Sequence, residues 1–201
     1  MHISEGVLSP AVLVAGGAVT FVGTGLGLKR IDYDHIMTVS LLTATFFVAS
    51  LIHVPLGPGN IHLVLGGLMG LVLGWSAFPA ILIALLLQAI FFQYGGLVVL
   101  GANTTVMALP AVGCYYLFRK WIETNGNKRK MAAFAAGFFS PLLSSLLMAL
   151  ALATSDQGFL QTAQLVVAAH IPLMIIEGVI TMFIILFLSR VQPEFLSIGK
   201  S

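Results

Sequence analysis

The chain has 201 residues, of which 59% are hydrophobic and only 8% are charged. Soluble domains carry about 25% charged residues, so this composition excludes an ordinary soluble protein and indicates an integral membrane protein. The net charge of +2 comes without a basic arm, so we expect no nucleic-acid binding, and the single cysteine, Cys114, excludes an internal disulfide.

Long apolar runs divide the sequence into seven segments. They are too long for the alternating strands of about ten residues that build a membrane β-barrel. The sequence therefore predicts an all-α, polytopic membrane bundle of about seven transmembrane helices, forming a single domain over residues 1–201. The predicted segments are 7–28, 36–52, 63–75, 78–92, 106–118, 131–153 and 165–188.

Three passages interrupt the helical pattern. Residues 53–62, HVPLGPGNIH, contain two prolines and two glycines, and we expect an irregular outer loop that lies against protein or a polar cavity. Residues 95–105, GGLVVLGANTT, form a second glycine-rich passage. Residues 119–130 are the most polar stretch, and we expect them to form a cytoplasmic loop.

The basic residues predict the orientation in the membrane. With seven crossings, every Lys and Arg follows the first, fifth or seventh segment, and all of them therefore fall on one side. By the positive-inside rule that side is cytoplasmic, so the amino terminus is expected outside and the carboxy terminus inside. A model with six or eight spans would break this asymmetry. The residues are Lys29, Arg30, Arg119, Lys120, Lys128, Arg129, Lys130, Arg190 and Lys200.

Small residues recur at intervals of four, which lets helix backbones approach closely in lipid. Gly66, Gly70 and Gly74 follow this spacing in the third segment, as do Gly23 and Gly27 in the first. Packing inside the bundle is the favoured interpretation. A face for a partner membrane subunit is the alternative.

The first two residues, Met1 and His2, can form a compact metal chelator. The Met1 amine, the His2 amide nitrogen and His2 Nδ1 close fused rings and supply three nitrogens in one plane, a set that suits Ni(II), Cu(II) or Co(II). A removable signal peptide would have a positive start, but no Lys or Arg precedes Lys29, so we expect a retained terminus. The alternative is that His2 is an ordinary polar residue on a frayed terminus.

A fourth nitrogen would complete a square-planar site. His62, at the end of the loop 53–62, is the best candidate, and His53 is its rival. His170 and Glu177 lie seven residues apart on one face of the last segment.

Glu177 is the only carboxylate deep in a predicted span, where a charge costs roughly 2.5–3.5 kcal/mol on insertion scales. We therefore expect either a structural hydrogen bond to a neighbouring helix or a functional role. The residue lies too deep to join the chelate, so Glu177→Gln should impair folding or transport more than metal affinity.

Several neutral or acidic groups are candidates for orienting ligands or joining helices rather than for binding metal directly. They are Glu5, Asn60, Gln88, Asn103 and Thr104.

Motifs of enzymes are absent from the sequence, which has no HExxH, GxSxG, P-loop or cysteine cluster. We therefore expect a chain that is not an enzyme. If it moves a solute with ATP, another chain must hydrolyse the nucleotide.

The sequence resembles the CbiM/NikM family, the substrate-binding membrane components of energy-coupling factor (ECF) cobalt and nickel transporters. The resemblance covers nearly the whole chain and is carried by MHISEG at 1–6, PLGPGNIH ending at His62, GGLVVLGANT at 95–104 and HIPLMIIEGVIT at 170–181. It implies that Met1, His2 and His62 hold the metal and that the amino-terminal segment is tucked into a seven-helix bundle. One stretch departs from the pattern, because many relatives have a further histidine where this chain reads FQYGG.

The resemblance also implies partners. They are a CbiQ/NikQ-like transmembrane coupling subunit, CbiO/NikO-like ATPases and a small CbiN/NikN-like membrane subunit. We expect a multi-pass protein of the inner (plasma) membrane that contacts lipid, captures Ni(II) or Co(II) outside and passes it inward. The alternative is a stand-alone secondary transporter or channel coupled through Glu177. The sequence leaves the choice between nickel and cobalt open.

Overall fold

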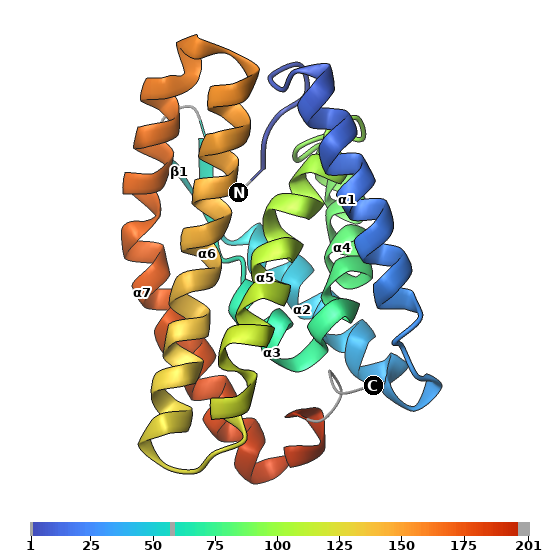
Figure 1. The fold of residues 1–201 in the computed structure, drawn as a ribbon, viewed down its shortest axis with the longest axis vertical. Helices are drawn as coiled ribbons and strands as arrows, with labels where there is room; N and C mark the ends of the chain where they lie inside the picture. Colours follow the sequence, from blue (N-terminus) through green and yellow to red (C-terminus); the bar gives the residue numbers. More distant parts are fainter. Residues whose placement is uncertain (1, 57–58, 197–201) are drawn as a thin grey trace.

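The structure, a computed structural model, describes residues 2–56 and 59–196 and is mainly helical. Within these ranges, seven α-helices form an elongated bundle with one β-hairpin among them (Figure 1). The helices are α1 (Pro10–Leu28), α2 (Ile36–Leu51), α3 (Gly66–Leu73), α4 (Ala77–Phe92), α5 (Leu100–Ile122), α6 (Asn127–Ser155) and α7 (Leu160–Val191). The hairpin strands are β1 (His53–Leu56) and β2 (Gly59–His62), and the short 3-10 helices are η1 (Tyr33–His35), η2 (Gly74–Ser76), η3 (Gln157–Phe159) and η4 (Pro193–Leu196).

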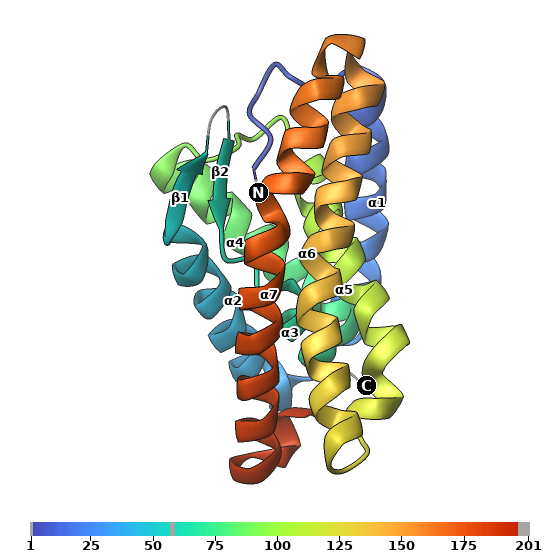
Figure 2. The same ribbon diagram turned by 90° about the vertical axis from the view of Figure 1, so that its left-hand side faces the viewer.

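The two ends of the bundle differ in charge. Helices α1, α5 and α7 run from the end that carries the hairpin to the opposite end, and α2, α4 and α6 run back (Figures 1 and 2). The basic residues that the structure describes lie at or beyond the last turns of α1, α5 and α7 or in the first turn of α6. They therefore share one end of the bundle, which we call the basic end. Its orientation in a membrane stays a prediction.

Five stretches among the described residues are long and apolar enough to cross a membrane, so seven full spans are not confirmed. Helices α3 and α4 count together as one stretch, and α5 is not one of the five. Helix α5 has Asn and Thr side chains in its first turns and Arg119 and Lys120 in its last, which lowers its hydropathy. The five stretches are Pro10–Leu28, Tyr33–Leu51, Gly66–Phe92, Asn127–Ser155 and Gln164–Val191.

Helix α3 is the buried centre of the bundle. It has only 8 residues, all of them buried, and it packs against α5, α6 and α7. A Cβ at Gly67 would collide with the Ala136 carbonyl on α6, and a Cβ at Gly70 would collide with Ala111 on α5. The prediction that small residues at intervals of four serve packing inside the bundle is confirmed at Gly70, while Gly67 lies outside that pattern.

Gly70→Ala is expected to lower the stability of the protein by about 1–3 kcal/mol, because its methyl group must displace the backbone of α5. Gly113→Ala is the control, since a Cβ there meets no atom within 4 Å. In the middle of helix α5, that change should raise stability by about 0.5–1 kcal/mol. Thermal unfolding of both variants in detergent measures the difference, and equal melting temperatures would contradict the packing of α3.

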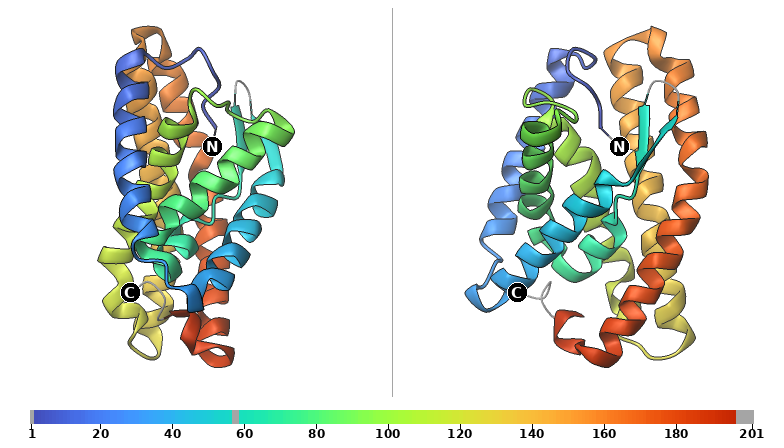
Figure 3. Two further views of the ribbon diagram at one scale, coloured as in Figure 1. Left: turned by 90° about the vertical axis from the view of Figure 1, so that its right-hand side faces the viewer. Right: turned by 180° about the vertical axis from the view of Figure 1, so that it is seen from behind.

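The prediction of an irregular loop at 53–62 is wrong. Strands β1 and β2 pair antiparallel, with His53 opposite His62 and Pro55 opposite Asn60 (Figure 3). The pairing satisfies backbone N–H and C=O groups that would otherwise need partners beside the membrane interior. The hairpin lies between the end of α2 and the start of α7, and β2 leads directly toward α3.

Two other loop predictions also need correction. Helix α5 begins at Leu100, so the polar residues 103–105 lie in its first turns, and the Thr104 hydroxyl donates to the Leu100 carbonyl at 2.8 Å. At the basic end, α5 continues to Ile122 and α6 starts at Asn127, so the loop predicted at 119–130 is only four residues long. The polar composition of 119–130 did not indicate a long loop, because the charged residues belong to the last turn of α5 and the first turn of α6.

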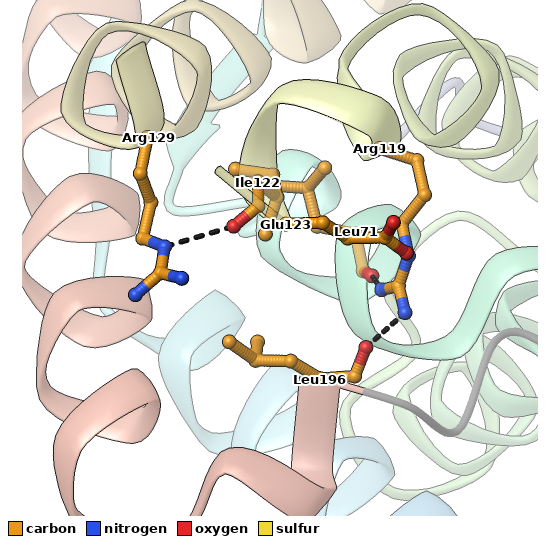
Figure 4. Close-up of polar contacts among 6 residues, drawn as sticks. All are labelled: Leu71, Arg119, Ile122, Glu123, Arg129 and Leu196. Atoms are coloured by element: carbon orange, nitrogen blue, oxygen red, sulfur yellow. Dashed lines mark hydrogen bonds and ion pairs between the residues drawn. The ribbon is translucent and has the colours of Figure 1, made fainter. Parts of the chain in front are cut away.

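Arg119 is a buried residue that holds the basic end together (Figure 4). Its guanidinium donates to the Leu71 carbonyl on α3 at 2.9 Å and to the Leu196 carbonyl of η4, and it pairs with Glu123 at 3.4 Å. Nearby, Arg129 donates to the Ile122 carbonyl at 2.8 Å and so caps the end of α5. These contacts join the inner end of α3 to α5, α6 and the carboxy-terminal segment.

Candidate metal site

Residues 2–9 lead from the start of α1 into the bundle, as the resemblance implied (Figure 1). Ile3 is buried, and the Asn103 side chain on α5 holds its backbone from both sides. The Ile3 amide donates to Asn103 Oδ1 at 3.0 Å, and Asn103 Nδ2 donates to the Ile3 carbonyl at 3.1 Å. Because the two bonds fix both the position and the rotation of this peptide, they also set where His2 lies. Met1 lies outside the described residues.

The turn before α5 leaves room for this segment. Gly95 and Gly96 have φ of +77° and +131°, values that favour glycine. A Cβ at Gly95 would come within 2.8 Å of Asn103 Nδ2, and a Cβ at Gly96 would collide with the Glu5 side chain. Glu5 in turn accepts a hydrogen bond from the Val98 amide at 3.0 Å. The motifs MHISEG and GGLVVLGANT, far apart in the sequence, therefore fit each other.

His2 and His62 meet at the inner end of this segment. The distance from His62 Nε2 to His2 Nδ1 is 3.1 Å, and the ring centroids are 4.7 Å apart. His62 is only 2% exposed and is the last residue of β2. The structure thus brings together the two side chains that the sequence predicted as metal ligands.

On each ring, the nitrogen that faces away from the other histidine makes a hydrogen bond, and this bond sets the tautomer of the ring. His62 Nδ1 lies 3.0 Å from the Leu63 carbonyl, which can only accept, so Nδ1 carries the proton and Nε2 has a lone pair. His2 Nε2 lies 2.8 Å from Gln88 Oε1, so Nε2 carries the proton and Nδ1 has the lone pair. The two inner nitrogens therefore present lone pairs to each other at 3.1 Å. A metal ion bound by both nitrogens, or a proton on either of them, turns this contact into an attraction.

Gln88 can accept a hydrogen bond from His2 because its own amide group is held in one orientation. It is fully buried on α4, and its Nε2 donates to Ser50 Oγ and, at 3.4 Å, to the Phe47 carbonyl on α2. With the amide nitrogen bound to α2, Oε1 must face His2. Such outer contacts fix the tautomer and the ring orientation of a metal-binding histidine.

Gln88→Leu is expected to lower metal affinity by about 10–100-fold while the protein still folds, because the His2 ring loses the acceptor that fixes its tautomer. Gln164→Leu, on an exposed position of α7, is the matched control and should not change affinity. Isothermal titration with Ni(II) measures both. Identical affinities for the two variants would mean that the His2 tautomer does not matter.

Burial keeps both imidazoles neutral near neutral pH. It lowers the pKa of His2, against a smaller raising effect of the hydrogen bond with Gln88. For His62, burial lowers the pKa to about 4; the hydrogen bond with Leu63 opposes this and the nearby His170 adds to it. Neutral imidazole is the form that binds metal ions.

Tyr94 is a neighbour of the site that sequence reasoning missed. Its ring lies 5.9 Å from the His2 ring and stacks on Phe92 at 5.8 Å, so it covers one side of the imidazole. The residue belongs to FQYGG, the stretch that departs from the family pattern. That departure was the available signal, but position alone did not show that the ring would reach His2.

The remaining predicted residues divide into three groups. Thr104 bonds only to its own helix, as described above. His170 is 3% exposed and its Nδ1 lies 2.6 Å from the Val166 carbonyl of the same helix. The side chains of His53 and Asn60 lie outside the part of the structure that is described, so their predicted roles stay predictions.

Glu177 reaches the neighbourhood of the site indirectly. It is fully buried on α7, and its Oε1 accepts a hydrogen bond from the Val64 amide, two residues after His62. The hydrogen bond was expected to join a neighbouring helix; instead it joins α7 to the segment between β2 and α3. Through it, α7 positions the chain that carries His62.

Described side chains supply only part of a metal site. Among them, a set that leaves out those of 53–61, no group of three or more His, Cys, Asp or Glu is placed to hold a metal ion. The His2 and His62 imidazoles, 3.1 Å apart, are the pair that the structure brings together.

Comparison with known proteins finds relatives over nearly the whole chain. The family model CbiM, described as "Cobalt uptake substrate-specific transmembrane region", matches residues 2–195. A candidate metal transport protein of Haemophilus influenzae is 40% identical over 200 residues, covering 96% of each chain. The cobalt transport protein CbiM of Lachnoclostridium phytofermentans is 32% identical over 92% of this chain and 81% of its own length.

A longer relative and a solved structure extend the comparison. The fused nickel transport protein NikMN of Rhodobacter capsulatus is 29% identical over 98% of this chain, which spans 64% of that protein. A crystal structure of a transition metal transporter superposes with a TM-score of 0.82 at 28% identity, over 95% of this chain and 93% of the other. Since the family model matches nearly the whole chain, this protein belongs to the CbiM family of substrate-specific transmembrane components for cobalt uptake.

Proposed function

We propose that this chain is the substrate-binding component of an ATP-driven ECF-type importer that captures Ni(II) or Co(II). The observation that supports the proposal best is the pair of imidazole nitrogens, His2 Nδ1 and His62 Nε2, at 3.1 Å with their lone pairs facing each other. Relatives named for nickel and for cobalt transport support the class of cargo.

The distance suits two neighbouring ligands of one ion. Metal–imidazole bonds of about 2.0–2.1 Å at a right angle place the two nitrogens about 2.9 Å apart. In a square-planar chelate the His2 amide and the Met1 amine would take the other two positions, with His62 next to His2 Nδ1. Four nitrogens in one plane suit Ni(II), and the general order of affinities also places nickel above cobalt.

The rest of the proposal concerns topology and partners. The end of the bundle with the chelate faces outside, and the basic end faces the cytoplasm across the inner (plasma) membrane, in line with the positive-inside rule. A transmembrane coupling subunit, a pair of ATPases and a small membrane subunit complete the importer, because the sequence has no P-loop of its own. ATP hydrolysis in these partners distorts the bundle and releases the ion inward.

The test uses the purified chain without partners, carrying a carboxy-terminal tag. It should bind one Ni(II) or Co(II) tightly in isothermal titration, and it should not accumulate metal in proteoliposomes by itself. Failure to bind either ion would refute the substrate assignment. Accumulation against a gradient by the lone chain would instead support a stand-alone secondary transporter.

A further inference from the structure

His170 on α7 is a buried histidine whose outer nitrogen has no assigned use. Its ring is 3% exposed, and Nδ1 lies 2.6 Å from the Val166 carbonyl, one turn earlier on the same helix. A carbonyl can only accept, so Nδ1 carries the proton and Nε2 has the lone pair. Nε2 is buried and has no hydrogen-bond partner among the described residues. A buried nitrogen without a partner has lost its hydrogen bond to water, so this lone pair calls for a ligand.

The register between α7 and the chain after β2 places His170 at the depth of His62. Glu177 of α7 accepts hydrogen bonds from the Val64 and Leu65 amides. From this contact, two helical turns on the same face, ~10.5 Å, lead back to His170 toward the hairpin end. Two residues, up to ~7 Å of chain, lead back from Val64 to His62. Since α7 also packs against β2 (Figure 2), the two histidines lie near each other on neighbouring elements.

The electrostatics of His62 agree with this placement, because repulsion by His170 contributes to the lowered pKa of His62. Yet the three imidazoles are not gathered around one point. Among the described side chains, no group of three His, Cys, Asp or Glu is placed to hold a metal ion. His170 is therefore a neighbour of the pair formed by His2 and His62, and not a third member of it.

A chelate that includes the His2 amide cannot close in one step. The amide must lose its proton before its nitrogen can bind a metal ion. Until then, His2 Nδ1 and His62 Nε2 are the imidazole nitrogens that hold the ion. A further lone pair on the same chain acts at high effective concentration, so it keeps the ion in place until the chelate closes. Once four nitrogens fill one plane, that ligand is no longer needed.

We propose that His170 Nε2 is a transient ligand, which holds Ni(II) or Co(II) beside His62 while the amino-terminal chelate forms or opens. The inference rests on the proposed function, which supplies the identity of the ion. The bond between His170 and the ion breaks as the deprotonated His2 amide binds, and the amide proton passes to water. Because the same intermediate is crossed in both directions, His170 speeds binding and release alike and leaves the dissociation constant unchanged.

The experiment compares rates with affinity in the full chain carrying a carboxy-terminal tag. Stopped-flow absorbance of the bound Ni(II) gives the association rate, mixing with excess EDTA gives the dissociation rate, and isothermal titration gives the dissociation constant. In His170→Leu, both rates should fall at least about tenfold. The dissociation constant should change by less than about threefold. A purely structural role would instead lower the melting temperature or the affinity without slowing release.

Thr181→Val is the matched control. Like His170, this residue lies on α7, is buried and has a polar atom without a partner among the described residues, but it is eleven positions closer to the basic end. It should leave both rates unchanged.

Unchanged rates in His170→Leu would overturn the proposal, and so would faster release with weaker binding, which is the mark of a permanent ligand. If His170→Leu does not fold, His170→Gln, which keeps a polar side chain but no imidazole, decides by the same measurements. Titration of the unchanged protein with Ni(II) tests the proposed function separately. Tight binding there with unaltered rates in the variant would refute only the role of His170.

Discussion

Adding a single residue before Met1 is expected to lower the affinity for Ni(II) by at least about a thousandfold, which is ~4 kcal/mol. The extension converts the α-amine into an amide and moves the five-membered chelate ring out of register. His2 and His62 would remain, but two imidazoles hold a metal far less tightly than four nitrogens in one plane. Amino-terminal acetylation should have the same effect without added length.

The control is the same tag placed at the carboxy terminus, after η4, which lies at the basic end of the bundle (Figure 1). Isothermal titration of the two matched proteins with Ni(II) gives the comparison. Both should be monodisperse and melt at similar temperatures, because Asn103 holds the segment through the Ile3 backbone in either case. Equal affinities would show that Met1 supplies no nitrogen.

His62→Ala is expected to abolish high-affinity metal binding, again by about a thousandfold or more. The ring is buried, its Nε2 lies 3.1 Å from His2 Nδ1, and its Nδ1 is committed to the Leu63 carbonyl. The hydrogen bond between Glu177 and the Val64 amide involves backbone on one side and is retained in the variant. The fold around the vacated position should therefore persist.

His53→Ala, on the opposite strand of the hairpin, is the comparison and should have a mild effect. Titrations with Ni(II) and Co(II), alone and in competition, measure the loss and the preference between the two ions. If His53→Ala removed metal binding and His62→Ala did not, the assignment of His62 as the fourth nitrogen ligand would be wrong.

The expected result for Glu177 changes with the structure. From its depth in the span, Glu177→Gln was expected to affect folding or transport more than affinity. The bond to Val64 shows that the residue holds the segment just after His62, so metal affinity should also fall when it is lost. The position of Glu177 within its predicted span did not reveal this contact, because its partner Val64 lies in the segment between β2 and α3.

The sequence by itself determined the class of the protein and the clustering of basic residues at one end of the bundle. Both follow from composition and hydropathy, which can be read from the order of residues without knowing which helices pack together. It also predicted His2 and His62 as metal ligands, and the structure brings the two rings together, while their role as ligands stays a prediction. Asn103 and Gln88 were expected to join helices or to orient a ligand; in the structure Asn103 bonds to the Ile3 backbone and Gln88 to the His2 ring.

Only the tertiary structure decided which nitrogens face each other and what holds them. The tautomer of His2 depends on Gln88, whose orientation depends on Ser50 and Phe47 of another helix. The hairpin at 53–62 could not be predicted from its prolines and glycines, because strand pairing satisfies the backbone only when the two halves meet. Buried Arg119 was likewise predicted to lie in a loop, since its partners Leu71 and Leu196 are distant in sequence and offer only backbone carbonyls, which no sequence pattern displays.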